Sequence, residues 1–463
     1  MNAPLSPERL RQIEDDQARI HEAVQYAPAA SGSRLKRALD GINRLSVTDW
    51  RSGLARRGDR IIGDERNVGL AFALAPELVG IVRFNRFSLK VELARSPPWR
   101  SAAAGETWTD DDDLGMQVWL QEREVEVRYR GIVADSVVLA SKDFAYHPVV
   151  DRFQSLTWDG RPRLDTWLID FLDAEGPPAY LTAIGSRFLI SVVARVMQAG
   201  CKVDHALVFE GEQGIGKSTI ARILAFEPEW FCDDMPDLHS KDSAIQLAGK
   251  LIVELAELAA IRRSAEVESV KAFISRSQDT FRPPYGRRTV SVPRQCVFIG
   301  TTNEREYLRD RTGNRRFWPV RIPRRIDLAA LERHRDQLYA EAVHRFTAGD
   351  QWHLTDTEAA LATTEQHDRL LVTVLESDVA EYLARMECQN IREITMKQVM
   401  VDALGLDAHA GDFAERAGRL GTQVASALDR SGWKKVATVG RGASRRTVYR
   451  KPDNSQGFTG VNV

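Results

Sequence analysis

Residues 206–219 read Ala-Leu-Val-Phe-Glu-Gly-Glu-Gln-Gly-Ile-Gly-Lys-Ser-Thr, and this stretch decides the fold. Its first four residues form a short apolar run, which is typical of a buried strand. Residues 211–218 then fit the pattern G-x-x-x-x-G-K-[ST], whose glycines let backbone N–H groups close around phosphates at a helix N-terminus. The sequence therefore predicts a strand, a phosphate-binding loop and a helix in succession, within an α/β fold.

The pattern also assigns chemistry to individual side chains. Its lysine, Lys217, reaches the β and γ phosphates of a nucleotide, while Ser218 offers a hydroxyl to Mg²⁺ and Thr219 is a weaker substitute. An ordinary loop is the competing interpretation, but average residue frequencies give a chance match in only about one or two per cent of chains this long. We therefore expect ATP and Mg²⁺ as cofactors. The residues expected at the nucleotide are Gly211, Glu212, Gln213, Gly214, Ile215, Gly216, Lys217, Ser218 and Thr219.

A second apolar run, residues 249–254, ends in Glu254, and Glu257 follows three residues later. A phosphate-binding loop needs an acidic partner at the end of a neighbouring buried strand, to hold the metal and to activate water. Glu254 is the expected metal contact, and either glutamate could activate water. A solvated strand end is the alternative.

A third apolar run, residues 296–300, leads through two threonines to Asn303. An amide at a strand end can sense the γ-phosphate or hold the attacking water, although a turn asparagine is the plainer interpretation. Further on, Arg315 and Arg316 follow a Gly-Asn turn within residues 310–319. Either arginine could be a finger donated to the ATP of a neighbouring subunit, or could form a surface ion pair.

In this order, these motifs and Trp158-Asp-Gly-Arg-Pro-Arg-Leu164 resemble the virulence-associated protein E family, over roughly residues 65–350. That family is similar to the superfamily 3 helicases of phages and mobile elements. The resemblance implies a P-loop AAA+ type core, a homo-oligomeric ring that we expect to be a hexamer, and work on DNA during replication. It also suggests a primase as a partner, because larger relatives often carry a primase module that residues 1–150 do not show. ATPases commonly have two adjacent acidic residues at the end of this strand, whereas here Glu254 and Glu257 are separated by two residues. Which of the two glutamates activates water therefore stays open.

Two basic segments are candidates for DNA contact. Residues 281–294 carry arginines and a tyrosine at a glycine turn, without an acidic residue, and the family has a pore hairpin for single-stranded DNA in this interval. A surface turn paired with carboxylates such as Asp279 is the alternative. The residues assigned here are Arg282, Tyr285, Arg287, Arg288 and Arg294.

Residues 430–451 hold eight basic residues and no acidic one, whereas the whole chain has a net charge of −1. Helices expected near residues 378–386, 396–404 and 413–428, with strands near 433–439 and 447–449, suggest a winged helix-turn-helix that binds duplex DNA. The residues assigned to phosphate contact are Lys434, Lys435, Arg441, Arg445 and Arg446.

A chain of 463 residues is expected to hold two or three domains. We expect an N-terminal helical arm with a mixed α/β accessory region at 1–150, the AAA+ type core at 151–350, and the winged-helix-like domain with a disordered tail at 351–463. The four cysteines have neither zinc nor disulfide spacing, and the charged N-terminus has no apolar run. These features favour a reduced, cytoplasmic protein without a membrane partner. The acidic residues 110–113 suit a helix N-terminus better than a metal cluster.

The function that follows is an ATPase: an ATP-dependent DNA helicase or translocase of a phage or mobile element, acting as a ring in replication. The alternative is a replication initiator or regulator that binds DNA and uses ATP to assemble, without unwinding. A small-molecule kinase would leave the Gly-Asn-Arg-Arg run and the basic C-terminal segment without a role.

Overall fold

The computed structural model divides the chain into two compact units, and each is described by itself. One comprises residues 1–305 and 310–367, and the other comprises residues 306–309 and 368–463. The predicted helical arm and polar tail lie outside the residues that the structure describes. Those residues are 50–233, 241–256, 264–282, 288–308, 314–324, 326–370, 374–439 and 446–452.

A parallel five-stranded sheet forms the centre of the first unit, in the order β12-β6-β11-β8-β7. Nearly all of its strand residues are buried, which explains why the strands are continuous apolar runs. The predicted α/β class is therefore confirmed, and the structure adds that the sheet is parallel. The strands are β6 (Ala206–Glu210), β7 (Phe231–Cys232), β8 (Ile252–Leu255), β11 (Val297–Thr302) and β12 (Phe317–Arg321).

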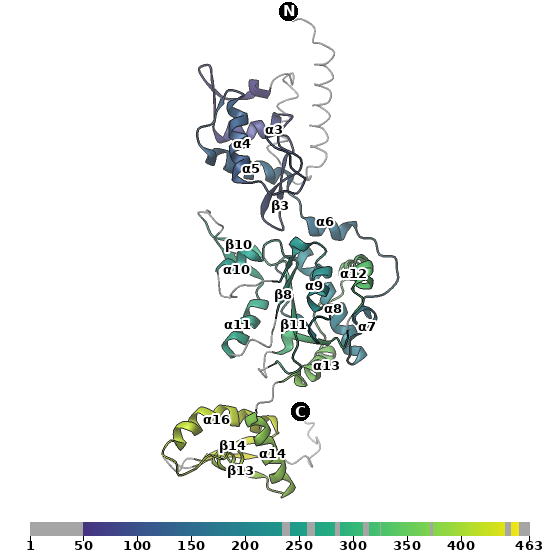
Figure 1. Cartoon of the computed structure of the whole chain (residues 1–463), viewed down its shortest axis with the longest axis vertical. Coiled ribbons are helices and arrows are strands. Elements are labelled where there is room, and N and C mark those ends of the chain that lie inside the picture. The colour runs from purple at the N-terminus through teal and green to yellow at the C-terminus, as the bar shows by residue number, and fades with distance from the viewer. Residues whose placement is uncertain are drawn as a thin grey trace, which may run out of the picture. The chain divides into compact units, whose positions relative to one another are not determined.

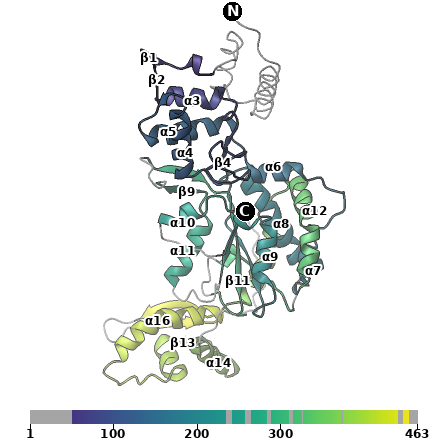
Figure 2. The same ribbon diagram turned by 45° about the horizontal axis from the view of Figure 1, so that its top comes forward.

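Helices cover both faces of this sheet (Figures 1 and 2), with α8, α9 and α12 on one side and α10 and α11 on the other. The bounds are α6 (Pro148–Ser155), α7 (Trp167–Leu172), α8 (Pro178–Met197), α9 (Lys217–Leu224), α10 (Lys241–Gln246), α11 (Ser264–Ile274), α12 (Leu328–Thr347) and α13 (Asp356–His367).

Helix α8 is long and apolar enough to cross a membrane by length and composition alone. However, 83% of its most apolar window is buried within the protein. Such burial is typical of the core helix of a water-soluble domain.

The Trp-Asp-Gly-Arg-Pro-Arg-Leu motif docks the segment before α7 onto α12. Arg163 forms a two-pronged ion pair with Asp159, and the backbone N–H groups of Arg163 and Leu164 donate to Glu341 on α12 at 2.6 and 3.0 Å. Gly160 has a φ of +80°, a left-handed conformation that glycine adopts at low cost. This motif is therefore structural.

Residues 50–147 form a mixed α/β region, as predicted, around a core that includes Met116, Trp119 and Val133. The acidic run begins a helix: Asp112 accepts from the Thr109 backbone N–H at 3.0 Å and caps it. The elements are α3 (Glu65–Leu74), α4 (Asp110–Gln121), α5 (Arg130–Ser141), β1 (Arg56–Arg57), β2 (Arg60–Ile62), β3 (Val82–Asn85), β4 (Lys90–Leu93) and β5 (Val125–Glu126).

Between α11 and β11 the chain forms an antiparallel hairpin of β9 (Gln278–Phe281) and β10 (Val290–Pro293). This hairpin occupies the basic segment assigned to single-stranded DNA, and residues 283–287 between its strands lie outside the described ranges.

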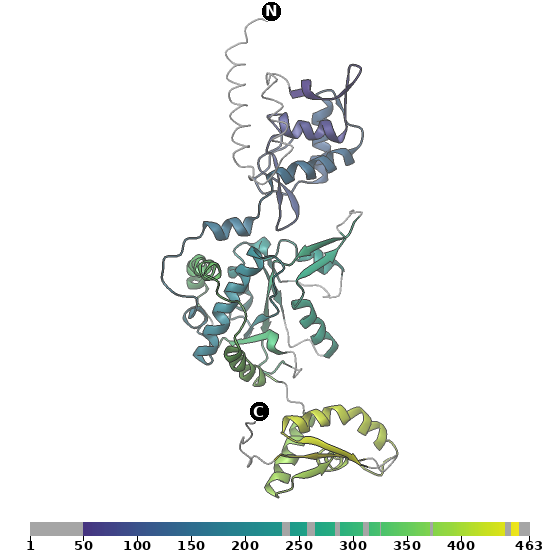
Figure 3. The same cartoon turned by 180° about the vertical axis from the view of Figure 1, so that it is seen from behind.

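In the second unit, helices pack on an antiparallel three-stranded sheet of order β13-β15-β14 (Figure 3). Its core includes Val379, Val399, Val424, Leu428 and Trp433. The helices and strands expected here are present, and β13 was not expected. The elements are α14 (Val374–Cys388), β13 (Glu393–Thr395), α15 (Met396–Gln398) with a π-helical turn at Val399–Ala403, α16 (Phe413–Arg430), β14 (Lys434–Val439) and β15 (Arg446–Arg450).

Candidate functional site

The glycine-rich loop, residues 211–218, connects β6 to α9 and needs its glycines. Gly214 and Gly216 have φ angles of +83° and +107°, in the region that other residues rarely adopt. A Cβ atom on Gly211 would lie 2.4 Å from the backbone oxygen of Ile322. The loop is anchored by Ile215, whose side chain is buried.

Lys217, the first residue of α9, joins the ends of two strands. Its Nζ donates to the carbonyl oxygens of Gly211 and Glu212, both at 2.7 Å, and to Oδ1 of Asn303 at 2.8 Å. Burial lowers the pKa of Lys217, and the nearby Glu254 carboxylate opposes that shift in part. Lys217 and Asn303 were assigned to one site from the sequence, and the structure brings them into contact.

Glu254, at the end of β8, joins three elements. Its Oε1 accepts from Ser218 Oγ on α9 at 2.7 Å and from Thr301 Oγ1 on β11 at 2.8 Å. Its side chain is 3% exposed. A carboxylate buried beside the loop hydroxyl is the arrangement expected for a shared metal contact.

Thr301 is the one residue of this cluster that sequence reasoning missed. In the parallel register Ile299 lies opposite Glu254, so Thr301 is two residues further along β11 and on the same face as Ile299. This strand register could have indicated Thr301 as a partner of Glu254, but only if β8 and β11 were already known to be neighbours.

The far end of α9 is held by α12. Tyr339 Oη donates to the Leu224 carbonyl at 2.8 Å, and Arg335 Nη1 lies 3.3 Å from the Ile223 carbonyl. A cation and a hydroxyl at these last carbonyls satisfy the helix C-terminus. The helix that carries Lys217 and Ser218 is thus fixed at both ends.

The remaining loop and catalytic candidates are placed as follows. Glu212, Gln213 and Thr219 are exposed, while Glu257 lies outside the described ranges. Arg315 is exposed, whereas Arg316 is half-buried and its Nε donates to Ser275 Oγ at 2.9 Å.

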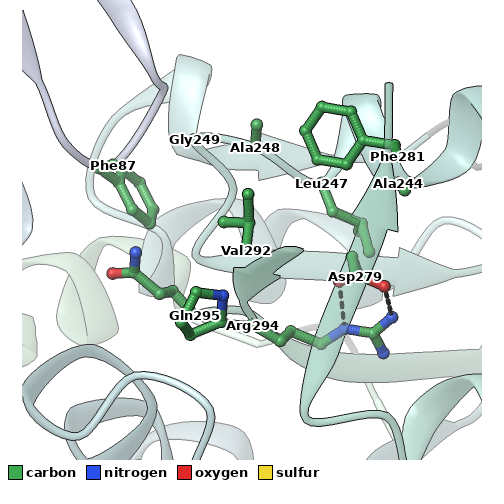
Figure 4. Close-up of a pocket in the computed structure, with 11 residues that line it drawn as sticks. Phe87, Ala244, Leu247, Ala248, Gly249, Asp279, Phe281, Val292, Arg294 and Gln295 are labelled. Atoms are coloured by element: carbon green, nitrogen blue, oxygen red, sulfur yellow. Dashed lines mark hydrogen bonds and ion pairs between the residues drawn. The ribbon is translucent and has the colours of Figure 1, made fainter. Parts of the chain in front are cut away.

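The prediction that Arg294 contacts phosphate is wrong. Its guanidinium forms a two-pronged ion pair with Asp279, with Nε to Oδ2 at 2.8 Å, and donates to the Phe273 carbonyl. Arg294 is 2% exposed and lies at a small pocket beside the hairpin, lined also by Phe87, Leu247 and Val292 (Figure 4). Arg294 stabilises the hairpin base instead.

Elsewhere on the hairpin, Arg282 and Arg288 are exposed. Tyr285 and Arg287 lie outside the described ranges, so their predicted roles stay predictions.

Carboxylates from other segments neutralise half of the basic residues in the C-terminal segment. Four of the eight pair with acidic side chains of the same unit, and Arg441 and Arg445 lie outside the described ranges. Within the described residues, Lys435 and Arg446 are exposed and make no such pair. The four pairs are Arg430–Glu376, Lys434–Asp429, Arg450–Glu393 and Lys451–Glu387.

The comparison with protein-family models agrees with the sequence resemblance. Residues 153–370 match the model of the virulence-associated protein E-like domain. No curated protein matches the chain. Among solved structures, the apo structure of the NrS-1 C terminal region (305–718) is 13% identical, with a TM-score of 0.41; the match covers 80% of this chain and 96% of that one. The A form apo structure of the same region is 13% identical with a TM-score of 0.42 and the same coverage.

The family match contains the whole cluster around Lys217 and Glu254, together with the hairpin and both candidate finger arginines. Residues 153–370 are therefore similar to the virulence-associated protein E-like domain.

Proposed function

We propose that this chain is an ATP-dependent DNA helicase or translocase of a phage or mobile genetic element, acting as a ring in DNA replication. One observation carries the proposal: Lys217, Ser218, Glu254 and Asn303 meet at the carboxyl ends of three adjacent parallel strands. In open α/β sheets, ligands bind outside those ends. The P-loop AAA+ type core that we propose requires such a parallel sheet, with the nucleotide site at the carboxyl ends of its strands.

The residues at this edge fit ATP with Mg²⁺. The loop presents backbone N–H groups at the N-terminus of α9, where the helix dipole favours phosphate, and Lys217 supplies a positive charge. Ser218 and Glu254 would hold Mg²⁺, which proteins usually bind through one or two carboxylates together with nucleotide phosphates. When bound, Mg²⁺ would neutralise charge on the transferred phosphoryl group.

Hydrolysis also needs an oriented water and a stabilised transition state. Because Glu254 already accepts hydrogen bonds from Ser218 and Thr301, we propose that Glu257 and Asn303 orient or activate the attacking water. An arginine from the Gly-Asn-Arg-Arg run would act on ATP in the next subunit, which requires a head-to-tail ring. We propose a homo-hexamer for that ring.

The hairpin β9–β10 and the second unit supply the proposed DNA contacts. Exposed Arg282 and Arg288 flank the hairpin end and suit the backbone of single-stranded DNA. In the second unit, three helical segments and an antiparallel sheet form the proposed winged-helix-like domain for duplex DNA, with Lys435 and Arg446 on the strands of the wing.

The function is tested by measuring ATP hydrolysis with and without single-stranded DNA, together with strand displacement on a forked duplex. We expect DNA to stimulate hydrolysis and ATP to drive displacement. Hydrolysis without displacement would favour the initiator or regulator, which uses ATP only to assemble. Hydrolysis indifferent to DNA would contradict the helicase or translocase.

For the wing, we expect Lys435→Ala with Arg446→Ala to weaken duplex binding and to lower the slope of log affinity against log salt by about 1 for each phosphate that the variant no longer neutralises. The matched control is Lys434→Ala with Arg450→Ala, because those side chains already pair with Asp429 and Glu393 at 2.6 and 2.8 Å. Both double variants remove two charges. An equal change in slope for both would show that only net charge matters.

A further inference from the structure

Helix α4 of the accessory region has one apolar side in the core and a second one in solvent. Met116 and Leu120 belong to the core of residues 50–147. Leu114 and Val118, one helical turn apart, are 49% and 46% exposed, so no described part of the chain covers them. Single exposed apolar residues are common on soluble proteins, whereas neighbouring ones point to a binding surface.

A third exposed apolar group lies beside this helix. The Val127 carbonyl accepts from Gln117 and Gln121 of α4 at 3.1 and 2.8 Å, so the extended segment that leads into α5 runs along α4. Tyr129 belongs to that segment and is 72% exposed. We call the surface formed by three exposed side chains the α4 face: Leu114, Val118 and Tyr129.

The charge of α4 restricts what can bind there. Residues 110–122 hold five acidic residues and no basic one. Asp112 is bound to Arg100 at 2.7 Å, but Asp110 and Asp111 are exposed. An amphipathic partner with positive charge therefore fits the α4 face better than a neutral or acidic one.

The undescribed N-terminal residues join the described chain at this helix. Trp50 is the first described residue, and its ring stacks on that of Trp119, with centroids 5.8 Å apart and planes 15° apart. Trp119 follows Val118 directly on α4. Five residues of extended chain span at most about 17 Å, or roughly three helical turns, so a segment that ends near residue 45 can reach the α4 face.

The sequence of residues 34–45 has the required pattern. Leu35, Leu39 and Ile42 have the i, i+4, i+7 spacing of one helix face. The segment holds four basic residues and one acidic residue, a net charge of +3. Residues 8–24 also have apolar residues at helical spacing, but they hold three basic and five acidic residues, a net charge of −2. Charge therefore favours residues 34–45 as the occupant.

We propose that residues 34–45 dock on the α4 face of their own chain as an amphipathic helix, with their apolar side chains on Leu114 and Val118 and their basic side chains near the exposed aspartates. A short helix is marginal alone, but its attachment to Trp50 gives it a high local concentration at α4. This docking concerns the accessory region and does not depend on the proposed function.

Limited digestion of the full chain with trypsin tests the docking, because both N-terminal segments contain cleavage sites. A docked helix must detach before the protease can cleave it. We expect cleavage after Lys36 and Arg37 to be about tenfold or more slower than cleavage after Arg19 in the acidic segment. The variant Leu114→Asp with Val118→Asp should remove this difference and leave the rate at Arg19 unchanged.

Val138→Asp with Leu139→Asp is the matched control. Both residues are 40% exposed and lie on α5, in the same region, so this variant also replaces two exposed apolar side chains with acids. We expect it to leave cleavage after Lys36 slow. Equal acceleration by both double variants would show that added charge loosens the whole region, and would overturn the inference.

Cysteine cross-linking identifies the chain that supplies the segment, and does not require a charged substitution on α4. We expect Leu39→Cys with Val118→Cys, or Ile42→Cys with Val118→Cys, to form a disulfide within one chain under mild oxidation, and the single variants control for the four native cysteines. A disulfide between chains, formed on mixing Leu39→Cys protein with Val118→Cys protein, would show that a second copy occupies the face. That result would overturn the inference, and so would cleavage after Lys36 as fast as after Arg19 in the unmodified chain.

Discussion

Lys217→Ala is expected to abolish ATP hydrolysis and most nucleotide affinity. The loop and the start of α9 supply neutral N–H dipoles, so Lys217 is the one full positive charge of this subunit among the assigned nucleotide contacts. Losing a preorganised donor at developing charge costs about a hundredfold to a thousandfold in turnover, and the missing ground-state attraction adds to this. Single-turnover hydrolysis measures the loss in turnover, and equilibrium binding of ATP measures the loss in affinity.

Lys250→Ala is the matched control for that substitution. Lys250 Nζ also donates to two backbone carbonyls, those of Glu229 and Phe231, at 2.8 and 3.0 Å. It precedes β8, at the opposite end of the strand from Glu254. We expect this variant to retain ATP turnover once folded. Near-normal turnover in Lys217→Ala would refute the assignment of the loop.

The parts of the site that the sequence predicted are those set by local pattern. Strands β6, β8 and β11 are apolar because both faces of a parallel sheet are covered. Such apolar runs can be recognised in the sequence without knowing which strands lie next to one another in the sheet. Since all three strands are parallel, polar residues that follow them meet at one edge. This is why Lys217, Glu254 and Asn303, far apart in the chain, could be assigned together.

The errors and omissions depend on contacts between distant residues. Arg294 looked like a surface cation because the segment that holds it, residues 281–294, has other arginines and no acidic residue, but its partner Asp279 is across the hairpin. The eight positive charges of residues 430–451 were counted within the segment, whereas Glu376, Glu387 and Glu393 precede it by tens of residues. Local charge predicts neither burial nor pairing.

Very short elements were also missed. Strand β13 has three residues and β7 has two, too few to show a period of two. They form because an existing strand offers an edge, β15 in one case and β8 in the other. Their existence is therefore a consequence of the tertiary fold.

Glu254→Gln is expected to bind ATP and to lose turnover by about two to four orders of magnitude. An amide keeps the size of the side chain and can still accept from Ser218 and Thr301 through one oxygen, so the local structure should persist. What it loses is the negative charge that would face the metal. The Mg²⁺ concentration for half-maximal hydrolysis should therefore rise in this variant.

Two further variants separate the roles at this edge of the sheet. Glu257→Gln should keep the Mg²⁺ dependence of the unmodified chain and lose turnover if Glu257 activates water, because a general base acts on the proton and not on the metal. Glu341→Gln is the matched control for a buried glutamate: Glu341 accepts two hydrogen bonds on one oxygen, is 2% exposed, and lies on α12 away from the loop. We expect Glu341→Gln to lower the stability of the fold and to leave the rate of ATP turnover unchanged. Full turnover with an unshifted Mg²⁺ dependence in Glu254→Gln would place the metal-binding carboxylate elsewhere, and would remove the main reason for grouping β8 with the glycine-rich loop as one catalytic edge.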